Sequence, residues 1–295
     1  MKYLALISFI LYVETVSAQV NSFDGGMSAY RKIVKEEYGT ASTLAYYKVF
    51  FRKDSTQTGK YSEAQCVLQI SDHFTCFSDY YQLKVDSLED ILSHGRKDTD
   101  NSCLNQWNDA ASKINFNTKI ITDLSAQSIR VQIFTGLRDY EYTSAQPVLN
   151  WSLSSGDSIV NGISCQKATC NYAGRNYVAW YAEDIACPYG PYIFGGLPGL
   201  IMEIHDFNRN WIFTNNGVAS ATNTDILYLY KKGFISGSVK VTTREKALEA
   251  LQNEIENMGN LFLEVAGVQV LKDGKWLTPE QEAPRAASNL IEQKW

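Results

Sequence analysis

Three polar residues at the end of one apolar segment have the side-chain types needed for metal binding or acid–base chemistry: Glu203, His205 and Asp206. In an extended strand Glu203 and His205 share one face, ~7 Å apart, while Leu200 and Met202 take the other face. A carboxylate and an imidazole at that distance suit a zinc ion or proton transfer. No further ligand is fixed by spacing, so a solvated strand face is the favoured interpretation, and a metal-binding protein or hydrolase is the alternative.

The remaining motif inventory favours a non-catalytic protein. The chain has three histidines and contains no H-E-x-x-H, G-x-S-x-G, Walker-type or C-x-x-C pattern. No cofactor is expected, and no catalytic residue is assigned.

A loop rich in aromatic residues, proline and glycine precedes that strand. Leu197-Pro198-Gly199-Leu200 has proline and glycine where a type II turn requires them. The rings of the loop either fill the core, which is favoured, or form a binding surface. The candidate binding residues are Tyr189, Tyr192, Phe194, Leu197, Pro198 and Leu200.

The six cysteines form an even set, which in an exported protein indicates disulfides. A three-residue loop centred on Ser71 would place Cys66 opposite Cys76 in an antiparallel pair and allow a bridge. Cys165 and Cys170 lie ~16 Å apart along one strand, too far to pair with each other. Further links among the remaining cysteines stay open; the candidates are Cys103, Cys165, Cys170 and Cys187.

The first 18 residues have the pattern of a secretory signal peptide. A positive start at Lys2 is followed by an apolar run and by Val16-Ser17-Ala18, a small-residue cleavage site. The run is too short to cross a bilayer, and no later stretch is long enough, so no transmembrane segment is expected. A net charge of −5 disfavours a nucleic-acid partner. We expect a soluble periplasmic or extracellular protein.

Period-2 alternation of apolar residues dominates the chain and predicts a mainly β (α+β) fold with a few helices. Residues 171–175 predict a tight hairpin turn and residues 215–217 a turn or a bulge. A capping threonine and apolar residues on one face predict the clearest helix at 242–257. Strands are predicted at 44–52, 61–70, 73–82, 115–122, 129–134, 138–143, 148–153, 159–172, 175–182, 200–207, 211–219 and 228–234. Further helices are predicted at 24–38, 85–93 and 102–113, and a short strand pair at 259–276.

No linker or repeat divides residues 19–295, so one β-rich domain with a C-terminal helix and hairpin is predicted. A large antiparallel sheet curled around an apolar cleft, as in a half-open β-barrel, accounts for the number of strands.

Several separate blocks of residues match one family in order and spacing. They are Trp151, residues 160–168, residues 174–181, Asp184-Ile185, Gly190-Pro191, and Gly196-Leu197-Pro198-Gly199-Leu200-Ile201 with Asp206. In these blocks, within 151–206, the chain resembles the GLPGLI family, and Asn289-Leu290-Ile291-Glu292 is similar to that family's C-terminal ending. The resemblance implies an exported envelope protein, often encoded near TonB-dependent outer-membrane receptors, without an assigned reaction.

Three hypotheses follow. The favoured one is an envelope accessory or binding protein that holds an apolar ligand or a partner segment and works with an outer-membrane receptor. The second is the metal protein or hydrolase described above. The third is a structural interaction protein that docks on an envelope partner through the turn at 197–200.

Overall fold

The computed structural model describes residues 33–54, 59–93, 101–135, 138–233, 237–266, 271–272, 275–276 and 289–292. The predicted signal peptide lies outside these residues. Their strands are β1 (Val34–Thr40), β2 (Thr43–Phe51), β3 (Ser62–Ile70), β4 (Phe74–Asp79), β5 (Thr118–Asp123), β6 (Ser128–Phe134), β7 (Asp139–Ala145), β8 (Ser152–Val160), β9 (Ile163–Tyr172), β10 (Arg175–Ala182), β11 (Leu200–Asp206), β12 (Trp211–Ser220), β13 (Ile226–Gly233), β14 (Gly237–Ser238), β15 (Lys240–Val241), β16 (Leu271–Lys272) and β17 (Lys275–Trp276). Their helices are α2 (Tyr80–Ser93), α3 (Asn101–Ala111) and α4 (Arg244–Ala266).

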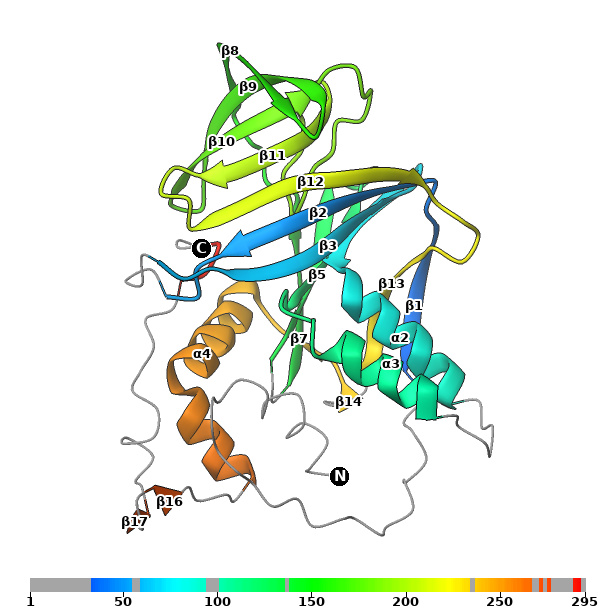
Figure 1. Cartoon of the computed structure of the whole chain (residues 1–295), viewed down its shortest axis with the longest axis vertical. Helices are drawn as coiled ribbons and strands as arrows, with labels where there is room; N and C mark the ends of the chain where they lie inside the picture. Colours follow the sequence, from blue (N-terminus) through cyan, green and yellow to red (C-terminus); the bar gives the residue numbers. More distant parts are fainter. Residues whose placement is uncertain are drawn as a thin grey trace.

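One sheet of 12 strands, in the order β15-β7-β6-β5-β4-β3-β2-β12-β11-β10-β9-β8, organises the molecule. Every pairing in it is antiparallel except that of β15 with β7. The two ends of the sheet do not meet, so it is not a closed barrel. Figure 1 shows how strongly it twists, with β12, β2 and β3 crossing the view and β5 and β7 running nearly along its long axis. The predicted large, open, mainly antiparallel sheet is confirmed.

Two hairpins show what the sequence pattern captured and what it missed. Ala173 and Gly174 have φ of 46° and 84°, which fits the predicted tight turn between β9 and β10. Asn161 and Gly162 have φ of 50° and 79° and form a second such turn between β8 and β9. The prediction of one strand over 159–172 is therefore wrong, although Asn-Gly is a strong hairpin signal.

The helix predictions at 85–93, 102–113 and 242–257 are confirmed by α2, α3 and α4. The predicted helix at 24–38 is wrong where it can be compared, because β1 begins at Val34. The predicted strand at 73–82 ends early because α2 begins at Tyr80. Around the predicted hairpin at 259–276, α4 continues to Ala266 and only β16 and β17 are strands.

The two faces of the large sheet carry different side chains. One face, called here the inner face, is apolar and packs against α4, the loop at 183–199 and residues 289–292. Its largest fully buried side chains include Tyr47, Phe77 and Phe213, with Phe77 in edge contact with both others at ring-centroid distances of 6.2 Å. The other, the helix face, is covered by α2, β1 and β13.

A C-terminal segment, residues 289–292, is part of the inner core. Arg175 Nη2 donates to Asn289 Oδ1 at 2.6 Å and to the Leu290 carbonyl at 2.7 Å, and Arg175 Nε donates to the Ile291 carbonyl at 3.1 Å. Three consecutive residues of the segment are thus held by one guanidinium, whose planar fork suits several acceptors at once.

Glu292 completes this attachment. Its Oε1 accepts hydrogen bonds from the hydroxyls of Tyr192 at 2.6 Å and Tyr172 at 3.2 Å, and its Oε2 pairs with Arg244 at the start of α4. Because the carboxylate is buried, these donors replace the water it loses.

Asp79 fixes α2 on the opposite face of the sheet. Its Oδ1 accepts the N–H of Tyr81 at 2.8 Å, as an N-cap does. Its Oδ2 accepts the N–H groups of Asn115 and Phe116 at 3.0 and 2.9 Å, just before β5. Burial raises the pKa of Asp79 to about 6. One carboxylate therefore ties the beginning of α2 to the segment that precedes β5.

Candidate functional site

The structure places the predicted binding loop in the inner core. Tyr192, Phe194, Leu197 and Leu200 are buried, with exposed fractions of 5%, 2%, 2% and 1%. Tyr189 is half-buried, while Pro198 is exposed. The ring of Phe194 lies 4.7 Å from that of Tyr177 and 6.4 Å from that of Phe213, measured between centroids. The loop therefore packs the sheet, and its role in binding stays a prediction.

The turn at 197–200 differs from the predicted type II geometry. Gly199 does not have the positive φ that a type II turn needs at this position, whereas Gly196 does, at 85°. A Cβ on Gly199 would lie 2.0 Å from the carbonyl oxygen of Ala182. Glycine is required here by the close approach of two backbones and not by a left-handed conformation.

Glu203, His205 and Asp206 do not converge. Asp206 is buried and forms an ion pair with Arg175 at 3.2 Å, and its Oδ1 accepts the N–H of Trp211 at 2.6 Å. His205 Nδ1 lies 3.1 Å from the carbonyl oxygen of Asp206, and Thr214 donates to Glu203 at 3.4 Å. Within the part of the chain that the structure describes, no group of three or more His, Cys, Asp or Glu side chains is placed to share a metal ion.

All six cysteines lie in described residues, and each is a free thiol. The register pairs Cys66 with Asp79 and Cys76 with Gln69, so the predicted opposition of Cys66 and Cys76 is wrong. Cys66 packs into the inner core and Cys76 into the cluster on the helix face. Of the others, Cys165 and Cys170 are buried, and Cys103 and Cys187 are half-buried. The predicted disulfides are absent from this structure.

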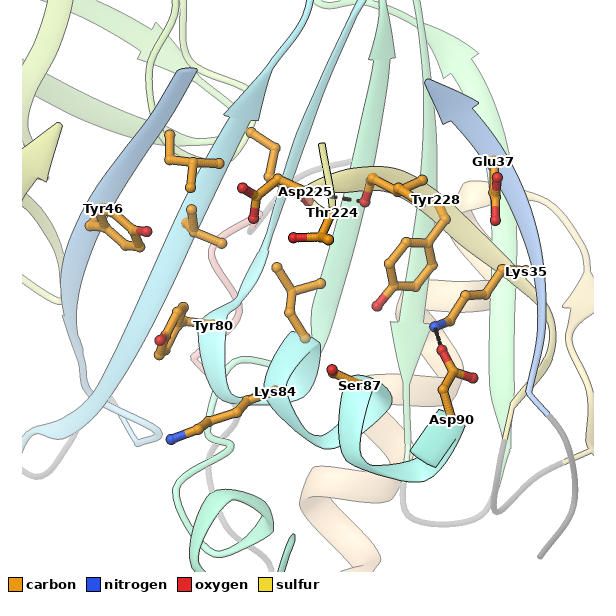
Figure 2. Close-up of a pocket in the computed structure, with 15 residues that line it drawn as sticks. Lys35, Glu37, Tyr46, Tyr80, Lys84, Ser87, Asp90, Thr224, Asp225 and Tyr228 are labelled. Atoms are coloured by element: carbon orange, nitrogen blue, oxygen red, sulfur yellow. Dashed lines mark hydrogen bonds and ion pairs between the residues drawn. The ribbon is translucent and has the colours of Figure 1, made fainter. Parts of the chain in front are cut away.

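A cavity of about 360 Å³ lies on the helix face, between α2, the loop before β13, and strands β1, β2 and β3. In Figure 2, Tyr46 and Tyr80 stand on one side of it and Tyr228 on the other, with Ser87 and Asp90 reaching up from α2 and Thr224 and Asp225 reaching in from the loop. The volume is within the ~300–1,000 Å³ range of small-molecule sites. The lining residues are Lys35, Glu37, Leu44, Tyr46, Val67, Gln69, Tyr80, Leu83, Lys84, Ser87, Asp90, Thr224, Asp225, Ile226 and Tyr228.

Gln69 lines this cavity and carries a buried hydrogen-bond acceptor without a donor among the described residues. The side chain is only 2% exposed, and its Nε2 donates to the carbonyl oxygen of Ile226 at 3.4 Å. Its Oε1 is buried without a donor among the described residues. A buried acceptor left unsatisfied costs about 1–3 kcal/mol, so this side chain destabilises the fold unless another role compensates.

A buried polar cluster holds Tyr228 rigidly at the cavity wall. The hydroxyls of Tyr228 and Tyr230 both donate to Asp86 Oδ2, and the Lys119 Nζ lies 3.4 Å from the centroid of the Tyr228 ring. The Lys119 Nζ has no hydrogen-bond partner among the described residues. Burial lowers the pKa of the Lys119 ammonium and raises the pKa values of both tyrosines well above the usual range. A second cation, the Lys35 ammonium, lies 4.7 Å from the same Tyr228 ring.

The charges around the cavity are mixed in sign. Lys35 and Asp90 form an ion pair of 2.6 Å, which is drawn in Figure 2. Asp225 Oδ2 accepts the N–H and the hydroxyl of Thr222 at 2.7 and 2.8 Å, so it also orders the loop before β13. The cavity therefore offers donors and acceptors together and no strong net field.

Sequence reasoning missed this site because its residues come from separate segments. β3 alternates between the faces of the sheet, so Gln69 has the pattern of a solvent-facing polar position. Only the packing of α2 and β13 over that face converts it into a buried group. The one available signal was the number of polar residues on strands that are covered on both faces. Lys119 and Gln132, for example, are both 0% exposed.

The fold and the cavity define an open β-sheet protein with a ligand-sized pocket of mixed polar and apolar lining on its helix-covered face. No family model matches the chain, and no curated protein matches it. Two solved structures are similar in chain path, "Structure of PNGF-II in C2 space group" (13% identity) and "Structure of PNGF-II in P21 space group" (12% identity). Each has a TM-score of 0.46. The matched region is 73% of this chain and 34% of the other, so this chain spans about a third of the length of those chains. Identities this low describe a similarity of fold and nothing of the chemistry. No helix of the described residues is both long and apolar enough to cross a membrane.

Proposed function

We propose that this chain is a non-catalytic binding protein that holds a small polar ligand in the cavity between α2 and β13. The observation that carries the proposal is a cavity of about 360 Å³ whose lining combines aromatic rings, apolar side chains and polar groups, among them Gln69, whose buried Oε1 has no donor among the described residues. Rings, apolar side chains and a few converging polar groups are the usual lining of a ligand site. The rigid anchoring of Tyr228 supports the proposal further, because a preformed wall lowers the entropy cost of binding.

The site differs from the one expected in the curve of the sheet. That interior is filled by Tyr192, Phe194 and Leu197 from the loop and by Leu248 and Leu251 from α4. An apolar ligand would have to displace core side chains there. Moving the ligand site to the helix face keeps the hypothesis of a binding protein and replaces an apolar ligand by a polar one.

A substitution that fills the cavity tests the proposal. Ser87→Trp projects an indole from α2 into the cavity, whereas Ile91→Trp adds the same ring at a position on α2 that is 60% exposed and outside the lining. Native mass spectrometry of protein purified from its host should show a small-molecule adduct in the wild type and in Ile91→Trp, and none in Ser87→Trp. An adduct that persists in Ser87→Trp, or its absence from all three proteins, contradicts the proposal.

Residence in the cell envelope and cooperation with an outer-membrane TonB-dependent receptor are further parts of the proposal. They depend on the resemblance to the GLPGLI family and on the signal-peptide pattern at 1–18. Cell fractionation with N-terminal sequencing should find mature protein beginning at Gln19 in the periplasm or the medium, and cross-linking in intact cells should capture a receptor. Full-length protein in the cytoplasm would contradict the export.

A further inference from the structure

The hydrogen-bonding groups of the cavity have a composition that selects among ligand classes. We propose that the cavity binds a neutral saccharide unit of one or two rings. This inference rests on the proposed function, since it names the ligand of the same site.

Hydroxyl groups fit the polar lining because they donate and accept at once. Gln69 lines the cavity and its Oε1 has no donor among the described residues, and the carboxylates of Glu37 and Asp225 are acceptors only. The Lys84 ammonium is a donor only, while the hydroxyls of Ser87 and Thr224 can act either way. A ligand with several adjacent hydroxyls can satisfy both kinds of group from one small framework.

The charge distribution favours a neutral ligand. The Lys35–Asp90 pair is internally compensated at 2.6 Å, and Asp225 is already engaged with Thr222. A net cation would face Lys84 and Lys35, and a net anion would face three carboxylates. With two ammoniums and three carboxylates the lining has a net charge of only −1, so neither sign of ligand charge meets a strong opposite charge.

The apolar part of the lining suits the flat carbon-bound face of a sugar ring. Tyr46 and Tyr80 make an edge contact with centroids 5.9 Å apart at one side of the cavity (Figure 2), and Leu44 and Val67 form its apolar floor on the sheet. Tyrosine rings such as those of Tyr46 and Tyr80 bury apolar area while their hydroxyl groups remain available for hydrogen bonds. The volume, near the lower end for ligand sites, limits the ligand to one or two rings.

Saturation-transfer NMR on the mature chain tests the ligand class. The probes are methyl glycosides of glucose, galactose, mannose and N-acetylglucosamine, the disaccharides maltose and cellobiose, and as charged comparators lysine, glutamate and glycerol phosphate. Gln69→Leu removes the unused acceptor, and Gln65→Leu is the matched control on the same face of β3 outside the cavity. Thr224→Val on the exposed loop is a second lining variant that leaves the sheet untouched, and circular dichroism confirms folding of each variant.

We expect at least one saccharide to bind, with affinity reduced about tenfold or more by Gln69→Leu, reduced by Thr224→Val, and unchanged by Gln65→Leu. The affinity should not change when the salt concentration is raised, because the ligand carries no charge. Binding of a charged comparator in place of every saccharide overturns this inference while the proposed function stands. Saccharide binding that neither lining variant weakens also overturns it. If no probe binds and native mass spectrometry finds no adduct, both proposals fail.

Discussion

The inner face and the helix face of the same sheet bury polar groups in opposite ways. On the inner face Arg175 donates to acceptors of residues 289–291 and pairs with Asp206, so these buried polar groups are paired. On the helix face, Gln69 Oε1 and Lys119 Nζ are buried and have no hydrogen-bond partner within the described part of the chain. Fully paired buried groups lock a structure, whereas unpaired ones cost stability and are retained where another role compensates. The inner face therefore stabilises the fold, and the helix face contains the cavity in which we propose that the ligand binds.

Removal of Arg175 is the strongest test of the locked face. Arg175→Met leaves Asp206 buried without its cation and frees residues 289–292, so we expect a loss of about 3–5 kcal/mol in the free energy of unfolding. Urea denaturation followed by tryptophan fluorescence measures it. Arg130→Met on the helix face is the matched control. Arg130 forms ion pairs with Glu36 and Glu141, and its side chain is 29% exposed. Because solvent screens these pairs, we expect a loss of about 1–2 kcal/mol in the free energy of unfolding. Equal losses would erase the contrast between the faces.

Gly199 tests the close packing behind the loop. In Gly199→Ala the added methyl group must overlap the carbonyl oxygen of Ala182, which is backbone and cannot rotate away, so a loss of about 2–3 kcal/mol is expected. Gly59→Ala is the control, since a Cβ there meets nothing within 4 Å, and its stability should be unchanged or slightly higher. Thermal unfolding compares the two, and a Gly199→Ala variant as stable as the wild type would show that the strand and the loop approach less closely.

The strands were predictable because alternation of apolar residues is a local property, and most of β2 to β13 follows it. The register was not: a shift in the β3–β4 turn, which pairs Ile70 with Thr75, moved Cys66 and Cys76 to opposite faces. The predicted type II turn at Pro198 and Gly199 was wrong because the same residue, glycine, serves two purposes. It can adopt a positive φ, or it can allow two backbones to approach closely, and the sequence does not distinguish these. The cavity was unpredictable in principle, since Gln69 becomes buried only through contacts with α2 and β13, which are distant in the sequence.

The pH dependence of stability provides a test confined to the helix face. Burial, and then the charge of Asp86, raise the pKa of Glu89 to about 8, while Trp107 Nε1 donates to its Oε1 at 3.1 Å. The folded state therefore keeps a proton that the unfolded state loses near its ordinary pKa of 4.5. The stability contributed by the protonated group is fully present below that pH and is lost as the pH rises through about 8.

Glu89→Gln should remove this dependence, because the amide keeps the acceptor for Trp107 and carries no charge. We expect the variant to match the stability of the wild type at acidic pH and to exceed it by an amount that grows to several kcal/mol as the pH rises from 4.5 to about 8. Urea denaturation across the pH range measures the difference. Glu249→Gln, at an exposed position of α4, is the control and should follow the wild type throughout. A Glu89→Gln variant with the wild-type pH profile would show that Glu89 is ionised in the folded protein.

The smallest expected change in stability is that of a substitution at His205, which the sequence indicated as a candidate for metal binding or acid–base chemistry. His205 is half-buried on β11 between Val178 and Ile212 on the neighbouring strands, and its Nδ1 makes a local contact with the Asp206 carbonyl oxygen. We expect His205→Gln to change the free energy of unfolding by less than about 0.5 kcal/mol. Excess zinc should leave the melting temperatures of the wild type and of the variant equal, because Asp206 is already committed to Arg175 and Trp211. Stoichiometric zinc that is bound by the wild type and not by His205→Gln would instead show a metal site on β11. That result would contradict the assignment of ligand binding to the helix face alone.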